Sequence, residues 1–284
     1  MLKIGDFNTL KVLRMQRGGY ILESGEPKQP EIYLPKREVE KPVRPGSEIR
    51  VFVFNESKQI LGATTSEPLA RVGEFAALRV KDITSFGAFL DWGIGKDLFV
   101  PRKFWLQPLH RDTLAIVYLK LDYEKWGVMG SCEVERFLRE DTEELESNQE
   151  VQLLLYEKTR LGYKVIIDNS WPGLLYHGDI FEPVCAGDIK SGFVKKVRED
   201  GQVDVVLHPQ GFRASSDAAR DTLLEALKQA GGFLPLHDKS EPGEIYSRLH
   251  ISKKLFKKTI GVLYREGLLI LSEEGISLSS EKRP

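Results

Sequence analysis

One pattern occurs three times in this sequence, at intervals of about 70 residues. Each copy has a glycine beside an aromatic residue, followed by a strand that ends in proline or histidine. The glycine segments are GGYIL at 18–22, FGAFL at 86–90 and LGYKVI at 161–166, and the following strands are IYLP at 32–35, LFVP at 98–101 and LLYH at 174–177. This interval is too long for a solenoid repeat and suits small β-barrels arranged in tandem.

The remaining strand patterns complete three barrels. Alternation of apolar and polar residues at 9–15 predicts a strand with one buried face, and the segments 75–83 and 114–122 are also predicted to be strands. Each hinge glycine is expected because a strongly coiled small barrel needs a bulge or kink where a strand turns. In this chain of 284 residues we predict five-stranded OB-type barrels at 1–67, 68–144 and 145–212. The acidic segment 133–150 is expected to be a short helix or a linker.

After residue 216 the period of the apolar residues changes from 2 to 3.6. This change predicts helices over 216–230, 244–249 and 253–266, the third with Ser252 as its N-cap, and then a hairpin over 268–278. Three helices followed by a hairpin is the order of a winged helix, which we place at 213–284. The expected fold class is therefore mainly β with a C-terminal α+β domain.

Small Greek-key barrels present one sheet face to oligonucleotides. Aromatic side chains on that face stack on bases at about 1–3 kcal/mol per base, and lysine or arginine follows the phosphates. We expect Phe86 and Phe89 on the outer face of the second barrel and Phe99 in its core; the alternative is that some of these rings simply fill the barrel. The basic candidates beside them are Lys81, Arg102 and Lys103.

The segment FGAFLD followed by DLFVP resembles the hinge and strand motif of the S1 RNA-binding domain. The resemblance implies that Phe86 and Phe89 are the two hinge aromatics, and that Pro101 stands where the family has a histidine. In the third copy it implies Tyr163 or Lys164 and, on the next strand, Tyr176 or His177, with the register open by one residue. The first copy has Gly18 at the first aromatic position and offers only Tyr20 and Tyr33, so we expect it to be structural or to bind weakly.

The third C-terminal helix has one apolar stripe, formed by Phe256, Ile260 and Leu263. Its basic residues lie outside that stripe: Lys253, Lys254, Lys257, Lys258 and Arg265. Winged helices contact phosphates or enter a groove with a helix at this position, so we expect a binding face, against the alternative of an ordinary solvated face. The helix lacks the additional side chains that usually recognise base edges.

The complete order, three such barrels and then a basic winged helix, resembles the conserved virulence factor B family of bacteria. This resemblance implies a cytoplasmic RNA-binding protein that regulates the expression of other genes, virulence genes among them, after transcription. The residues alone support binding of single strands.

Patterns for catalysis, metals and membranes are missing from the sequence. Cys132 and Cys185 lie far apart and outside any metal-ligand cluster, and the five histidines are scattered. The GIGK segment at 93–96 lacks the spacing of a phosphate-binding loop. No long apolar run and no signal-peptide pattern is present. We therefore expect a cytoplasmic, monomeric protein with no catalytic residues, no metal and no cofactor.

Three function classes remain open. The first is binding of single-stranded RNA by the barrels and the basic helix. The second is a DNA-binding transcription regulator that uses the winged helix, and the third is a protein adaptor of the translation machinery. The net charge of −1 excludes a uniformly cationic surface but not a local basic patch.

Overall fold

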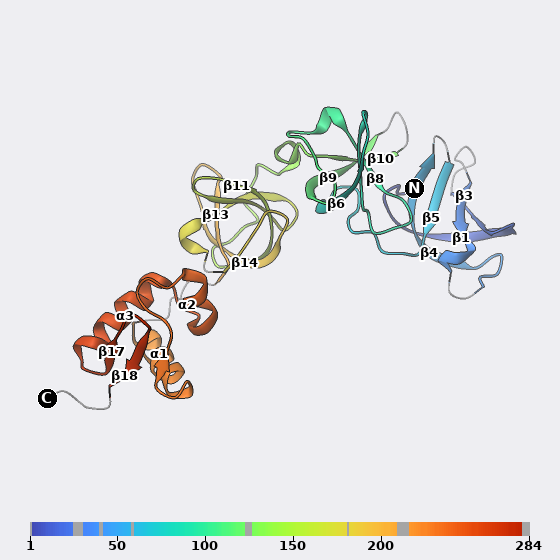
Figure 1. The fold of residues 1–284 in the computed structure, drawn as a ribbon. Coiled ribbons are helices and arrows are strands. Elements are labelled where there is room, and N and C mark those ends of the chain that lie inside the picture. Colours follow the sequence, from blue (N-terminus) through green and yellow to red (C-terminus); the bar gives the residue numbers. More distant parts are fainter. Residues whose placement is uncertain are drawn as a thin grey trace. The chain divides into compact units, whose positions relative to one another are not determined.

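The computed structural model describes residues 2–24, 31–39, 42–57, 60–122, 127–180, 182–208 and 216–279. Its elements form three closed five-stranded barrels followed by a helical domain with a three-stranded sheet (Figure 1). The predicted fold class, mainly β with a C-terminal winged helix, is confirmed. Within these residues, no helix is both long enough and apolar enough to span a bilayer.

The first barrel contains β1 (Asp6–Gln16), β2 (Gly19–Leu22), β3 (Ile32–Pro35), β4 (Glu48–Ser57) and β5 (Ile60–Thr64). The strands close in the order β1-β2-β3-β5-β4, with β3 and β5 parallel. Alternate residues point inward, as the apolar–polar pattern requires. The interior includes Val12, Tyr20, Leu34 and Val53.

The second barrel repeats this arrangement with β6 (Phe75–Ile83), β7 (Gly87–Leu90), β8 (Leu98–Pro101), β9 (Leu114–Asp122) and β10 (Gly127–Ser131). Trp92 is fully buried, and its Nε1 donates to the carbonyl oxygen of Ala70 at 2.7 Å. The ring of Phe52, from the first barrel, meets Trp92 edge to face at 5.4 Å. The first two barrels therefore share one apolar cluster.

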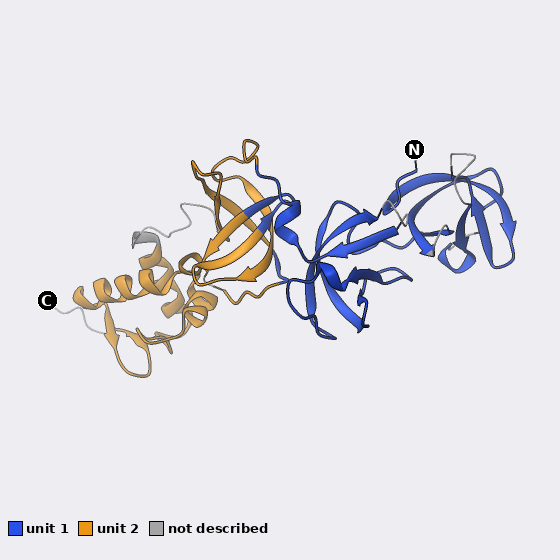
Figure 2. Cartoon of the chain, turned by 90° about the horizontal axis from the view of Figure 1, so that it is seen from above, with its two compact units in different colours: residues 1–140, 166–172, 187–189 blue, residues 141–165, 173–186, 190–284 orange. Residues whose placement is uncertain are grey.

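The third barrel contains β11 (Glu150–Lys158), β12 (Gly162–Ile167), β13 (Trp171–Tyr176), β14 (Ile189–Val197) and β15 (Val203–Val206). By density of contacts the chain forms two compact units, which Figure 2 colours separately. Unit 1 contains residues 1–140, 166–172 and 187–189, and unit 2 contains the remainder.

The winged helix contains α1 (Ser216–Gln229), α2 (Pro242–Leu249) and α3 (Lys253–Arg265). A short strand, β16 (Phe233–Leu234), pairs with the hairpin of β17 (Leu269–Leu271) and β18 (Ile276–Leu278). The hydroxyl oxygen of Ser252 accepts the backbone N–H of Leu255 at 3.2 Å, so the predicted N-cap is confirmed.

The hinge glycines have a different physical role from the expected bulge. A Cβ at Gly19, Gly87 or Gly162 would lie 2.3, 2.4 or 2.0 Å from a carbonyl oxygen of the next strand. None of the three has a positive φ. Glycine is required because two backbones approach closely, whereas the bulges nearest the hinges of the first two barrels lie in the preceding strands β1 and β6.

Candidate nucleic-acid interface

The outer face of the second barrel carries one row of side chains across four strands. Strand register places Phe89 of β7 opposite Phe99 of β8, Phe99 opposite Met129 of β10, and Met129 opposite Lys120 of β9. All four are half-buried, and the Phe89 and Phe99 rings lie 5.1 Å apart. We call Phe89, Phe99, Met129 and Lys120 the stacking row.

Phe86 lies immediately before the hinge glycine and is 80% exposed. Its carbonyl oxygen accepts the backbone N–H of Arg102 at 2.9 Å, which holds the start of the 3-10 turn Arg102–Phe104 against the hinge. Arg102 and Lys103 are exposed on this turn. The hinge and the turn thus bring together an exposed ring and two cations, three of the sequence candidates.

Lys81 occupies the bulge of β6 and is ion-paired. Its Nζ lies 2.8 Å from Oδ1 of Asp97. The hydrogen bond and the charge of Asp97 raise the pKa of Lys81. Its charge is therefore offset locally, and it is not among the phosphate contacts that we propose.

Besides Met129, three residues that lie on or beside this face are absent from the sequence candidates. Lys120 places its Nζ 3.7 Å from the ring centroid of Phe104 and 5.4 Å from that of Phe137. Desolvation lowers the pKa of Lys120, while the nearby Glu133 opposes the shift. Phe137 belongs to the 3-10 turn Val134–Phe137, and its ring stacks on Tyr118 at 4.2 Å, so this part of the acidic segment packs on the barrel.

The expected core position of Phe99 is wrong. Leu98 and Val100 on either side are buried, so the alternation of β8 directs Phe99 outward. Phe89 also points outward from β7 and lies directly opposite Phe99. If the two segments are paired as neighbouring antiparallel strands, the sequence already places both rings on one face. For Lys120, the signal was its position beside the apolar Leu119 in the strand 114–122, since Leu119 is buried and neighbouring side chains of a strand point to opposite faces.

The structure fixes the register of the third copy. The backbone N–H of His177 donates to the carbonyl oxygen of Leu161, just as that of Arg102 donates to Phe86 in the second barrel. His177 therefore corresponds to Arg102, and Tyr176 corresponds to Pro101. Lys164 then corresponds to Phe89.

Tyr163 corresponds to an interior residue: it is 6% exposed, and its hydroxyl donates to the carbonyl oxygen of Val184 at 3.0 Å. The alternative that placed Tyr163 on the binding face is wrong.

The outer residues of the third barrel bond to one another. Lys164 pairs with Glu157 at 2.9 Å, and Nε2 of His177 lies 3.0 Å from the carbonyl oxygen of Thr159.

A second pair lies beside these residues. Arg198 pairs with Asp204 at 2.6 Å and hydrogen-bonds the hydroxyl of Tyr176, and the bond to Asp204 is the main reason that the pKa of Arg198 is raised. This face is therefore polar and internally neutralised, and it offers no aromatic row.

In α3 the predicted apolar stripe is confirmed, because Phe256, Ile260 and Leu263 are buried. Lys254, Lys257, Lys258 and Arg265 are exposed and Lys253 is half-buried. The Nζ of Lys253 lies 3.4 Å from the carbonyl oxygen of Lys239, and Lys257 approaches Asp238 at 4.0 Å. No described carboxylate pairs with Lys254 or Lys258, so these two side chains are the open positions of the helix.

Comparison with known proteins identifies the domain types. Residues 4–66 match the model of the S1 domain, and residues 221–278 match that of the CvfB-like winged helix domain. The uncharacterized protein YitL of Bacillus subtilis (strain 168) is 27% identical over 94% of this chain and 90% of its own length.

Two named virulence factors align over nearly the whole chain. Conserved virulence factor B of Staphylococcus saprophyticus is 22% identical, and that of Staphylococcus aureus (strain USA300) is 20% identical; each alignment covers 98% of this chain and 95% of the relative. A crystal structure of a multidomain protein with nucleic acid binding domains from Streptococcus pneumoniae TIGR4 covers 97% of this chain and 98% of its own, at 23% identity and a TM-score of 0.44.

These matches agree with the observed order of elements. The S1 domain match covers the first barrel, whose topology the other two barrels share, and the CvfB-like match covers the helices and hairpin at the C-terminus. This domain content supports binding of nucleic acid. The chain thus contains an S1 domain and a CvfB-like winged helix domain, and over nearly its whole length it is similar to conserved virulence factor B.

Proposed function

We propose that this chain binds single-stranded RNA without catalysing a reaction, and that this binding regulates the expression of other genes after transcription. The observation that carries the proposal is the stacking row, with the exposed ring of Phe86 beside it. The regulatory role rests on the similarity to relatives that are named as virulence factors.

The stacking row favours single strands over duplexes. Its rings lie half-buried in the sheet, and a base reaches them only with an open face. Bases in a duplex already stack on their neighbours, whereas bases of a single strand can be splayed onto aromatic side chains. The acidic residues near the row are ion-paired, Asp82 with Arg111 and Asp97 with Lys81, so they oppose a phosphate backbone less than free carboxylates would.

Helix α3 supplies a second surface, which we call the basic helix face and define as Lys254 and Lys258. The positions of these lysines destabilise the helix. Lysines at the N-terminus oppose the helix dipole, and like charges four residues apart repel by about 0.2–0.5 kcal/mol per pair. The first turn contains no acidic residue to compensate. An anionic ligand such as a phosphate backbone would offset this cost.

The basic helix face also favours a second candidate function, binding of duplex DNA by the winged helix. The third helix of such domains commonly enters the major groove. Against this candidate, the sequence of α3 has a single arginine and no asparagine or glutamine, so it offers few side chains that bond base edges.

Fluorescence anisotropy of the full chain separates the two candidates. The ligands are a labelled single-stranded RNA and a duplex DNA of the same length and base sequence, at the same salt concentration. We expect tighter binding of the single-stranded RNA, and the RNA recovered from the mixture should be uncleaved. Equal or tighter binding of duplex DNA would overturn the proposal, and cleaved RNA would overturn its non-catalytic part.

A further inference from the structure

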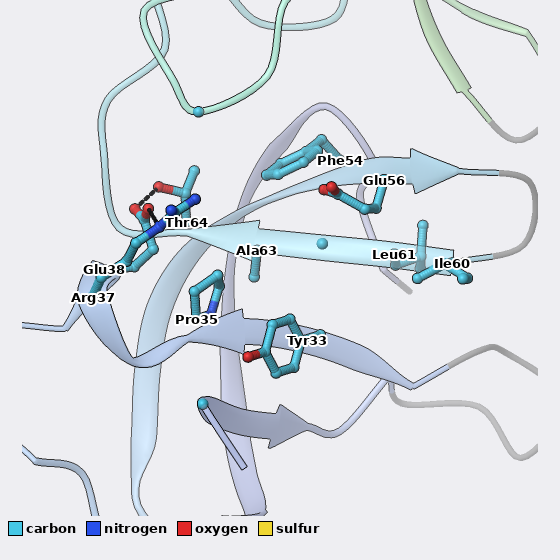
Figure 3. A pocket seen from close by; sticks show the side chains of 13 residues that line it. Tyr33, Pro35, Arg37, Glu38, Phe54, Glu56, Ile60, Leu61, Ala63 and Thr64 are labelled. Carbon is cyan, nitrogen blue, oxygen red and sulfur yellow. Dashed lines mark hydrogen bonds and ion pairs between the residues drawn. The ribbon is translucent and has the colours of Figure 1, made fainter. Parts of the chain in front are cut away.

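The first barrel contains a pocket at the position that the stacking row occupies in the second barrel. Its register places Ile21 opposite Tyr33, Tyr33 opposite Gly62, and Gly62 opposite Phe54. Gly62 thus takes the place that Met129 has in the second barrel. The missing side chain leaves a pocket of about 440 Å³ over β5 (Figure 3).

The two sides of this pocket differ in chemistry. Tyr33 and Pro35 line it from β3, and Phe54 and Glu56 line it from β4 (Figure 3). The ring of Tyr33 is half-buried and lies over Gly19, where a Cβ would be 2.8 Å from the ring. The ring is therefore held in place and presents an aromatic surface to the pocket.

The carboxylate of Glu56 points over the glycine. Its Oε2 lies 3.1 Å from the place that a Cβ of Gly62 would occupy. Among the described residues, no donor hydrogen-bonds these carboxylate oxygens; the nearby Lys96 bonds the backbone carbonyl oxygen of Glu56 instead. By contrast, Glu38 at the rim already accepts hydrogen bonds from Thr64 and Ser66. Within the described part of the chain, Glu56 is thus the open acceptor of the pocket.

An aromatic surface beside an open carboxylate selects one type of base. An ionised carboxylate only accepts hydrogen bonds and has two oxygens to offer. Guanine is the base whose Watson–Crick edge presents two adjacent donors, the N1–H and the 2-amino group. Uracil, cytosine and adenine each place an acceptor beside their donor, which the second carboxylate oxygen would repel.

We propose that this pocket binds one guanine base of a single-stranded RNA, stacked on Tyr33 and hydrogen-bonded to Glu56. The inference rests on the proposed binding of single-stranded RNA and adds a base preference to it. The volume lies at the lower end of the range for small-ligand pockets, about 300–1,000 Å³, and suits a nucleoside. Arg37 lines the rim with a side chain that is 80% exposed and pairs with Glu38 at 3.6 Å, so its charge is partly offset there.

The test compares labelled ten-residue oligouridylates that contain one central guanosine or one central inosine. Inosine lacks only the 2-amino group, so the pair isolates a single hydrogen bond to Glu56. We expect the full chain to bind the guanosine oligomer about tenfold more tightly, since hydrogen bonds to charged groups contribute about 1.5–3 kcal/mol.

Glu56→Gln should remove this preference, because an amide offers one acceptor and one donor where two acceptors are needed. Glu48→Gln is the matched control: it removes a carboxylate from the same strand, outside the pocket, and should keep the preference. Circular dichroism checks that both variants fold.

The outcomes separate this inference from the function on which it rests. Equal binding of both oligomers, or a preference that survives Glu56→Gln, would overturn the guanine pocket while binding of single-stranded RNA stands. Failure to bind either oligomer would overturn both.

Discussion

Phe86→Ala tests the role of the second barrel with little disturbance of its fold. The side chain is 80% exposed, so only about one-fifth of its roughly 200 Å² of surface is covered. At about 25 cal/mol per Å², this burial stabilises the fold by about 1 kcal/mol at most. Phe89 and Phe99 are less suitable probes, because each packs on the other and its loss would affect both fold and binding.

If the ring of Phe86 stacks on a base, its removal should cost about 1–3 kcal/mol of binding. That range corresponds to a rise in Kd of about 5- to 150-fold. Fluorescence anisotropy with a single-stranded RNA measures the rise, and urea unfolding measures the change in stability.

The third barrel offers a matched control, Leu161→Ala. Leu161 occupies the same hinge position, is 63% exposed and has no ring. Its replacement should leave the Kd nearly unchanged. The reasoning is refuted if the folded Phe86→Ala variant binds as tightly as the parent chain, or if Leu161→Ala weakens binding as much.

Three further predictions concern other parts of the molecule. The pair Lys254→Glu and Lys258→Glu should weaken RNA binding and lower the salt slope by about 1.4, for two lost phosphate contacts. The same pair should leave the unfolding free energy unchanged or raise it by up to about 1 kcal/mol, since an acid suits the helix N-terminus; loss of stability with an unchanged slope would contradict the binding role. Gly87→Ala should destabilise the chain by about 3 kcal/mol in urea unfolding, because its Cβ would lie 2.4 Å from a carbonyl oxygen; an unchanged midpoint would contradict the close approach. Burial raises the pKa of Cys132 to about 11, so at pH 8 only about one molecule in 1,000 carries its thiolate. A thiol reagent should therefore label the exposed Cys185 first and Cys132 only on unfolding; rapid labelling of both would contradict its burial.

The sequence predicts the strands most accurately where the β-rich segment is long. The segments 75–83 and 114–122 coincide with β6 and β9, each of nine residues. The burial pattern is harder to predict in four-residue strands, where one flanking residue changes which face of the strand is predicted to be buried. The segment LFVP is such a case, and Phe99 was expected inside although the strand directs it outward.

The binding faces are less predictable because they depend on pairing between distant strands. The contact of Lys120 with Phe104 and Phe137 joins three separate segments and leaves no local pattern in the sequence. The register of the third copy became clear only from the backbone hydrogen bond between His177 and Leu161. Likewise, the pocket of the first barrel arises because a glycine in β5 faces Tyr33 of β3, and these residues are far apart in sequence.

Photo-crosslinking of the full chain to a single-stranded RNA, followed by mass spectrometry of the linked peptides, tests the central claim most directly. The account predicts links to the peptides that contain Phe86, Phe89 and Phe99, and a second set of links at Lys254 and Lys258. Links confined to other surfaces, such as the ion-paired outer face of the third barrel, would contradict it.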